Sequence, residues 1–296
     1  MLPTGMIYFH EVARTGSITE AAVAQHVSAS AISRQITQLE SGIGVALFER
    51  HPRGMTLTDA GLLLLSHARR SAAEADALVT ELRDLHSRSN RVVKVVSTEG
   101  LARCRVPEAI AKFSAMHADV VFDLDVVSSA EASRRVVEGT ADVGVVYALG
   151  MQRDVTVEFS TASPAHAVLG AGSHLADRRF IGVRELCGFP LALPPKGVGQ
   201  REFFDIAAQM ENVRPSIRLV TVHVSPALEF VRAGAGATLL SHLAVHADTE
   251  VGLAFIPVDH PLFQQRQAQI QTMIGRRRSS AVAAFIDVLR DSLSEP

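Results

Sequence analysis

The chain has 296 residues, a hydrophobic fraction of 47% and a formal net charge of −2. This length exceeds one ordinary core and predicts two or three domains, and the hydrophobic fraction excludes a largely disordered protein. The near-neutral charge excludes a non-specific coater of nucleic acid, although a specific DNA binder needs only a positive docking face.

Signals for export, membrane insertion and disulfide bonding are missing from the sequence. The longest leucine run, Leu62 to Leu65, is far shorter than the roughly 20 apolar residues that span a bilayer. The N-terminus lacks the charged and then apolar regions of a secretory signal. Two cysteines, Cys104 and Cys187, suit a reducing compartment. We therefore expect a cytoplasmic protein with no membrane partner.

The first part of the chain predicts three short helices. An apolar stripe from Ile7 to Ala13 ends at Gly16, which suits a helix stop. Ser17 to Glu20 form a capping box that begins the second helix. The segment Gln25 to Val27 forms a turn, and Ser28 can cap the third helix. Two short helices joined by a tight turn are typical of a helix-turn-helix.

The third helix presents a polar face. Ile32, Ile36 and Leu39 recur at intervals of four and three and so share a buried face. At about 100° per residue, five polar side chains project away from this buried face or flank those that do. Gln35 lies nearer the buried edge. Such side chains can contact phosphates and base edges in a major groove, although a merely solvated face is the alternative. The outward set is Ser30, Arg34 and Thr37, flanked by Ser33 and Gln38.

A β-hairpin wing is predicted after the third helix. Pro52 and Gly54 mark a turn between two short extended pieces. The wing carries Arg50 and Arg53, which can clamp phosphates or enter a minor groove. Turn, recognition helix and wing together favour DNA binding over a solvated polar face.

A long helix is predicted from Thr58 to about Ser87. Its apolar residues alternate steps of three and four, which is the spacing of a coiled-coil seam. We read it as a dimerisation helix, which favours an inverted-repeat DNA site; a helix packed on its own domain is the alternative. The seam comprises Leu65, Ala68, Ala72, Ala75, Val79 and Leu82.

The last two hundred residues alternate strands and helices. Apolar, β-branched segments at Val92–Ser97, Val120–Val127 and Ala141–Tyr147 predict buried strands, with helices between them. A second α/β half follows from about Ala165 to Asp259, and Gln269 to Gly275 predict a strand that returns to the first half. Two α/β lobes joined by double crossovers form a cleft, with ligand groups at the carboxyl ends of strands.

Strand ends and helix starts supply candidate ligand contacts in that cleft. Hydroxyls at Thr98, Ser128 and Ser225 lie beside helix starts, which favours an anionic ligand, whereas Glu99 favours an amine or a polar neutral compound. Helix capping is the alternative role for each. The candidate effector-binding residues are Thr98, Glu99, Gly100, Ser128, Tyr147, Val198 and Ser225.

Five ordered motif blocks resemble the DNA-binding domain of LysR-type transcriptional regulators. These blocks are Gly16–Ala22, Ala31–Ile36 with Leu39-Glu40, Leu47–Arg50 and Leu57–Gly61, and Glu138–Val145 and Val231–Gly236 resemble the family's effector domain. The resemblance implies DNA contacts from Ser28, Ser30, Ser33, Arg34 and Gln35, supported by Arg50, Arg53 and Thr56 in the wing.

The resemblance also implies a domain plan and partners. The expected plan is a winged helix-turn-helix at residues 1–58, a dimerisation linker helix at 59–89 and a two-lobed α/β, periplasmic-binding-protein-like effector domain at 90–296. Lobe I would take about 90–163 and 266–296, and lobe II about 164–265. The implied partners are double-stranded DNA, a small-molecule effector, further copies of the chain as a dimer or tetramer, and RNA polymerase.

Other chemistry is set aside. His242 and His246 share helical spacing, but no third ligand is evident, so we expect no metal site. No catalytic motif stands out, and we expect neither catalysis nor a cofactor. Two alternatives stay open: thiol-based redox sensing through Cys104 or Cys187, and an α/β solute-binding protein or enzyme with an incidental helical N-terminus.

Overall fold

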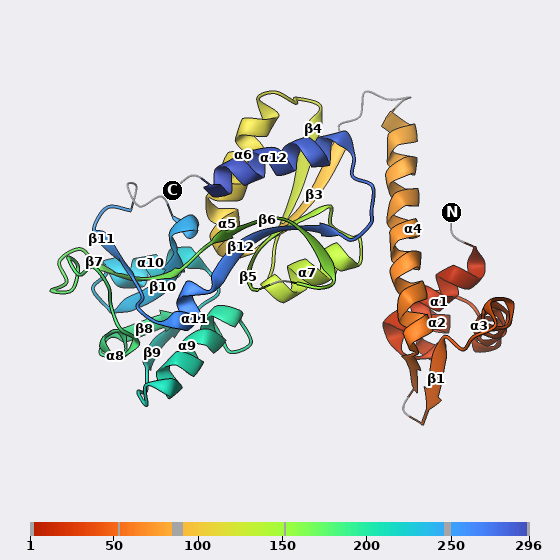
Figure 1. Ribbon diagram of the computed structural model, residues 1–296, viewed down its shortest axis with the longest axis horizontal. Coiled ribbons are helices and arrows are strands. Elements are labelled where there is room, and N and C mark those ends of the chain that lie inside the picture. Colours follow the sequence, from red (N-terminus) through yellow and green to blue (C-terminus); the bar gives the residue numbers. More distant parts are fainter. Residues whose placement is uncertain (1–2, 53, 85–90, 151, 246–249, 295–296) are drawn as a thin grey trace. The chain divides into compact units, whose positions relative to one another are not determined.

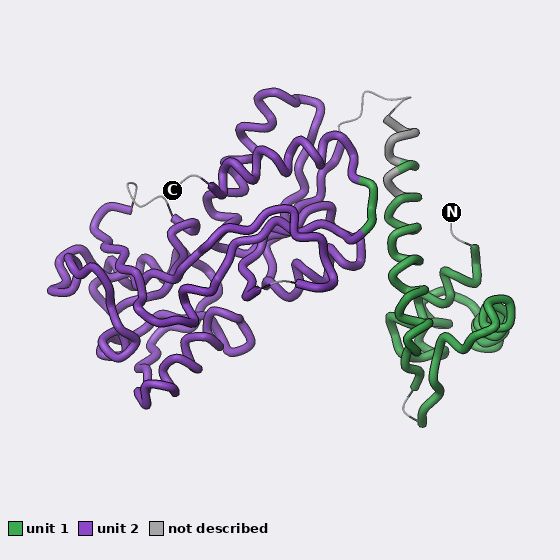
Figure 2. Tube along the Cα trace, in the orientation of Figure 1, with its two compact units in different colours: residues 1–89, 275–277 green, residues 90–274, 278–296 purple. Residues whose placement is uncertain are grey.

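The computed structural model describes residues 3–52, 54–84, 91–150, 152–245 and 250–294. The chain divides into two units, one of residues 1–89 with 275–277 and the other of residues 90–274 with 278–296 (Figure 2).

Unit 1 begins with three helices, a hairpin and a long helix (Figure 1). Ser17 caps the second helix by accepting a hydrogen bond from the Glu20 amide, and Ser28 caps the third in the same way from Ala31. Gly16 ends the first helix with a φ of 67°, as expected of a helix stop. The elements are α1 (Thr4–Thr15), α2 (Ile18–Ala24), α3 (Ala29–Ile43), β1 (Phe48–His51), β2 (Gly54–Leu57) and α4 (Asp59–Asp84).

One apolar core holds these elements together. Phe9 of α1, Ile32 and Ile36 of α3 and Leu47 are buried in it. Leu65 of α4 packs into the same core, so the prediction that Leu65 belongs to a dimer seam is wrong: the first turns of α4 serve their own domain. The prediction for Leu82 lies outside the described side chains.

Unit 2 contains two five-stranded mixed sheets. The first has the order β4-β3-β5-β12-β6, in which β3 is parallel to β4 and β5 and β12 is antiparallel to β5 and β6. The second has the order β11-β7-β10-β8-β9. The first sheet's strands are β3 (Arg91–Ser97), β4 (Val120–Val126), β5 (Val143–Leu149), β6 (Val155–Ala162) and β12 (Arg266–Met273). The second sheet's strands are β7 (Ala165–Gly170), β8 (Pro190–Leu193), β9 (Ser216–Val220), β10 (Ala237–Ser241) and β11 (Leu253–Pro257).

The chain crosses between the sheets twice, after β6 and again before β12 (Figure 1). These crossings confirm the expected two-lobed architecture with a returning strand. No helix in the described part of the chain is long and apolar enough to cross a membrane. The helices are α5 (Glu99–Arg103), α6 (Arg105–Ser114), α7 (Ser129–Val137), α8 (Val183–Leu186), α9 (Gly199–Met210), α10 (Val224–Arg232), η1 (His242–Ala244), α11 (Pro261–Gln264) and α12 (Ser280–Ser294).

Candidate functional site

The outer face of α3 is polar and open to solvent. Ile32 and Ile36 are buried on the opposite face. Ser28 is exposed but also structural, because its Oγ accepts a hydrogen bond from the Ala31 amide at 3.2 Å. Of the other candidate DNA contacts on this helix, Ser30, Arg34, Thr37 and Gln38 are exposed, whereas Ser33 and Gln35 are half-buried.

The wing presents a second exposed polar surface. Arg50 on β1 and Thr56 on β2 are both exposed, one on each strand of the antiparallel hairpin. The Thr56 hydroxyl lies 3.0 Å from Nε2 of His51. Arg53 lies outside the described residues. The guanidinium of Arg14 on α1 forms an ion pair with the Glu11 carboxylate of the same helix at 2.5 Å.

Unit 2 encloses a cavity of about 450 Å³ between its two sheets. This volume lies in the range of small-molecule pockets. Six of the seven candidate effector residues line it: Thr98, Glu99, Gly100, Ser128, Tyr147 and Val198. Ser225 is not among the lining residues; its neighbours Thr221 to Val224 take that place at the start of α10.

The start of α5 packs closely on Tyr147. A Cβ atom on Gly100 would lie 3.1 Å from the Tyr147 hydroxyl and 3.0 Å from Cβ of Ala244, so glycine permits this approach. The Tyr147 hydroxyl and Oγ1 of Thr98 are buried and make no hydrogen bond of acceptable geometry, although Ser241 lies near the tyrosine. Burial raises the pKa of Tyr147, which keeps its phenol protonated.

Arg266 lines the same cavity and was missed by the sequence analysis. Its side chain is 6% exposed, and its guanidinium lies 3.8 Å from the centre of the Tyr147 ring. Tyr147 on β5 pairs with Ala268 on β12, so Arg266 is the diagonal neighbour on the same sheet face. Burial lowers the pKa of Arg266. No local sequence pattern marks Arg266 as a cavity residue, because only the pairing of β12 with β5 brings this arginine beside Tyr147.

Glu99 links the two sheets across the cavity. It begins α5 next to the first sheet, and its Oε1 accepts a hydrogen bond from the Val224 amide of α10 at 3.3 Å. Its Oε2 lies 3.7 Å from Nδ1 of His223. A carboxylate at a helix N-terminus is favourable because it faces the unpaired amides and the positive end of the helix dipole. Glu99 therefore has a structural partner in the opposite lobe.

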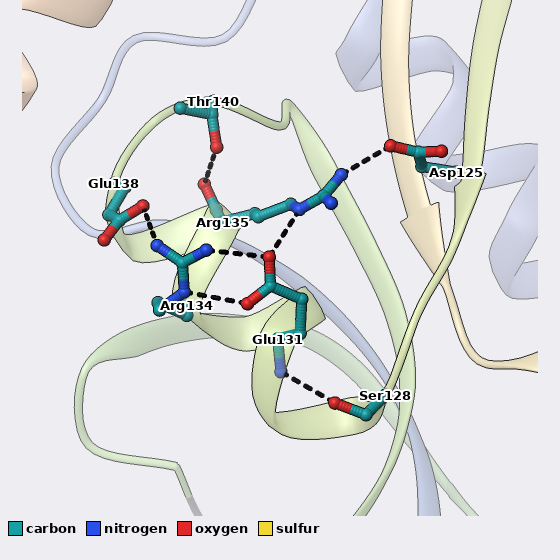
Figure 3. Close-up of polar contacts among 7 residues, drawn as sticks. All are labelled: Asp125, Ser128, Glu131, Arg134, Arg135, Glu138 and Thr140. Carbon is teal, nitrogen blue, oxygen red and sulfur yellow. Dashed lines mark hydrogen bonds and ion pairs between the residues drawn. The ribbon is translucent and has the colours of Figure 1, made fainter.

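The start of α7 is fixed by a cap and an ion-pair network (Figure 3). Ser128 accepts a hydrogen bond from the Glu131 amide at 3.2 Å. Arg134 and Arg135 both bind the Glu131 carboxylate, and Arg135 reaches Asp125 of β4 at 2.5 Å (Figure 3). Hydrogen bonds from these two arginines lower the pKa of Glu131 to about 2. The network ties the helix that lines the cavity to the edge of the first sheet.

Comparison with known proteins decides the family. Residues 86–294 match the LysR substrate binding domain, and residues 4–62 match the bacterial regulatory helix-turn-helix protein, lysR family. The chain belongs to the LysR family. It is a LysR-type transcriptional regulator, with a helix-turn-helix in unit 1 and an effector-binding domain in unit 2.

Relatives of this LysR-type regulator match it along most of its length. The HTH-type transcriptional regulator CysB of Burkholderia cenocepacia is 24% identical over 280 residues, which cover 94% of this chain and 89% of that protein. The RuBisCO operon transcriptional regulator of Allochromatium vinosum is 25% identical over 283 residues, covering 94% and 91%.

Solved structures share the fold of this LysR-type regulator. Full-length CbnR complexed with its target DNA has a TM-score of 0.55 at 20% identity, covering 99% of this chain and 100% of that chain. A full-length OxyR variant from Pseudomonas aeruginosa has a TM-score of 0.60 at 19% identity, covering 99% and 94%. At these identities the likeness shows the fold alone.

The two thiols of this regulator do not have the surroundings of an activated pair. Cys187 follows α8, and burial raises the pKa of its thiol, which lowers the fraction of reactive thiolate. Cys104 lies between α5 and α6, and its Sγ donates to the Ala244 carbonyl at 3.4 Å.

Proposed function

We propose that this regulator reads its DNA site with the outer face of α3 and is controlled by a small molecule in the cavity of unit 2. The exposed stripe of Ser30, Arg34 and Thr37, opposite buried Ile32 and Ile36, carries the DNA part. The guanidinium of an exposed arginine such as Arg34 can bind a guanine edge in two hydrogen bonds, and Arg50 and Thr56 of the wing would contact phosphates.

The proposed control by a ligand follows from the position of the cavity between the two sheets of unit 2. A ligand between the two sheets contacts both lobes, so it binds one lobe arrangement better than another and shifts the population. That shift would change the geometry of the assembly on DNA. The regulated partners would be the DNA site and RNA polymerase.

We further propose that the regulator works as a dimer through α4, and that dimers can pair into tetramers. Leu63 is 74% exposed and Leu78 is 55% exposed on this helix. Fifteen positions of 100° each place them about 60° apart around the helix axis. Leu62 and Val79 of α4 are also exposed, at 55% and 43%, and exposed large apolar side chains along a helix fit burial against a second copy. A dimer would present two copies of α3 to an inverted repeat.

The test is binding of purified full-length protein to the DNA between its own gene and the divergent neighbour. Fluorescence anisotropy would be recorded over a range of salt concentrations with random DNA as competitor. Arg34→Ala should weaken specific binding about 5-fold to 150-fold, because a bidentate base contact contributes about 1–3 kcal/mol. Arg218→Ala, an exposed arginine on edge strand β9, is the matched control and should bind as the parent does.

The pattern of the loss distinguishes the roles of Arg34. A phosphate contact would weaken specific and random DNA alike and reduce the salt slope by about one. Unchanged affinity in folded Arg34→Ala protein would refute the assigned DNA face. Protein that converts a metabolite but ignores every DNA fragment would support the rival enzymatic function.

A further inference from the structure

The cavity of unit 2 holds a buried positive charge without a counterion. Arg266 lines the cavity, and its Nη1 has no hydrogen-bond partner in the described part of the chain. No carboxylate among the described residues forms an ion pair with it; its close neighbour is the face of the Tyr147 ring. A buried, unpaired charge is unfavourable, so an anion bound beside Arg266 would offset that cost.

Two hydroxyls beside the same cavity are buried as well; Ser241 lies near that of Tyr147, whereas that of Thr98 has no hydrogen-bond partner among the described residues. Among the described residues that line the cavity, three buried side-chain atoms make no hydrogen bond of normal length and angle. These are Nη1 of Arg266, Oγ1 of Thr98 and the Tyr147 hydroxyl. A guanidinium can only donate, and a hydroxyl can donate, so the set is complementary to a group rich in acceptor oxygens.

The backbone at the cavity also carries partial positive charge, of the same sign as the charge on the side chain of Arg266. The helices α7, α9 and α10 all begin at the cavity, with Ser128, Val198 and His223 as their first flanking residues. Val198 provides no side-chain cap, and its carbonyl accepts hydrogen bonds from the Arg201 and Glu202 amides, so the amides of Gly199 and Gln200 are the ones that face a guest. Helix N-termini carry partial positive charge and bind anions.

Two acidic residues, Glu99 and Glu202, also line the cavity, but their carboxylates have other neighbours than Arg266. Glu99 faces the start of α10, where it accepts the Val224 amide and lies beside His223. Glu202 also lines the cavity, and it is exposed. Neither carboxylate pairs with Arg266. Much of the remaining lining is apolar: Val126, Leu149, Leu193, Phe203, Val222 and Leu239.

We propose that the effector is a small organic monocarboxylate or similar anion with an apolar body, whose acidic group binds Arg266 and the Thr98 hydroxyl. This inference rests on the proposed role of the cavity as the effector site. The apolar side chains would cover the body of the ligand, and Tyr147 would hold the guanidinium in place from its far face. Burial of the guanidinium already lowers the pKa of Arg266, and a bound anion would reverse that shift.

The chain supplies its own reporter for this binding. It has no tryptophan and two tyrosines, Tyr8 in unit 1 and Tyr147 at the cavity. A full-length Tyr8→Phe protein would leave Tyr147 as the sole tyrosine fluorophore. The probes are butanoate, hexanoate and cyclohexanecarboxylate, each against its own amide, with hexylamine as the cationic probe and ionic strength held constant. Calorimetry would check the affinities.

Carboxylates should change Tyr147 emission and bind at least about tenfold more tightly than their amides, because hydrogen bonds to a charged partner are the stronger kind. Arg266→Gln should lose at least about tenfold in carboxylate affinity, without lowering the thermal midpoint of the empty protein, because it removes an unpaired buried charge. Thr98→Val should lose less carboxylate affinity than Arg266→Gln does. Arg218→Gln is the control and should bind as the parent does.

Equal binding of carboxylates and amides would overturn the inference, and so would a preference for hexylamine or no response to any carboxylate at millimolar concentration. Failure of the proposed function looks different. Arg266-dependent carboxylate binding that leaves DNA binding unchanged would keep the inference and refute the regulatory role. DNA binding that responds to hexylamine but not to the carboxylates would keep the regulatory role and refute the inference.

Discussion

Gly61 in the first turns of α4 is the position where a single methyl group should most disturb the DNA-binding unit. A Cβ atom there would lie 2.1 Å from the Leu47 carbonyl oxygen and 2.9 Å from Cδ2 of Leu57. Carbon and carbonyl oxygen normally approach to about 3.3 Å, so Gly61→Ala must displace α4 from the backbone before β1 by about 1 Å. The obstacle is backbone, which cannot rotate away as a side chain can.

The size of the effect follows from what holds α4 in place. The Thr58 amide donates to the Leu47 carbonyl at 3.0 Å, and the Thr58 hydroxyl donates to the Ala46 carbonyl at 2.8 Å. Loss of these two bonds costs about 1 kcal/mol each, and overpacking adds about 1–3 kcal/mol. Against this, replacing a helical glycine by alanine stabilises the helix by about 1 kcal/mol. We expect Gly61→Ala to destabilise unit 1 by about 2–4 kcal/mol.

Hydrogen exchange of the full chain, followed by mass spectrometry of peptides from α1 to α3, localises the effect to unit 1. Protected amides there should exchange about 30-fold to several hundredfold faster. Gly42→Ala in α3 is the matched control: nothing lies within 4 Å of its Cβ position, so the same change should be neutral or stabilising. Equal exchange in the Gly61→Ala variant and the parent would refute this reasoning.

Two further predictions concern charged groups in unit 2. Glu250 is 5% exposed and pairs with both Arg103 and Arg232, so Glu250→Gln should lower stability by about 2 kcal/mol and the thermal midpoint by about 4–8 °C, measured by circular dichroism. The 68%-exposed Glu229 is the control, and an equal loss in Glu229→Gln would contradict the role of burial. Because the pKa of Glu131 is lowered to about 2 from 4.5, its contribution to stability is complete above about pH 5 and is lost as pH falls towards 2. The difference in urea midpoint between the parent and Glu131→Gln should therefore shrink over that range, and a constant difference would count against the network.

Local signals made the DNA-binding unit readable from the sequence. Capping at Ser17 and Ser28 depends on amides only three residues away, and the buried pair Ile32 and Ile36 follows helical periodicity. These interactions lie within one or two turns, so the residue types reveal them directly. The role of Leu65 was missed, because the spacing of a helix stripe does not say whether its partner is the same chain or another.

Within unit 2 the sequence likewise determined β3, β4 and β5, whose runs of β-branched residues suit buried strands. It did not reveal β6 or β11, edge strands with half-exposed patterns that acquire their identity by pairing with distant strands. The composition of the cavity was also beyond local patterns. Arg266 lies 119 positions from Tyr147, and only the antiparallel pairing of β12 with β5 buries the two side chains together. The sequence by itself thus determined the helices of the DNA-binding unit with their caps and the two-lobed plan of unit 2, whereas the charge of Arg266 at the cavity was decided by long-range strand pairing.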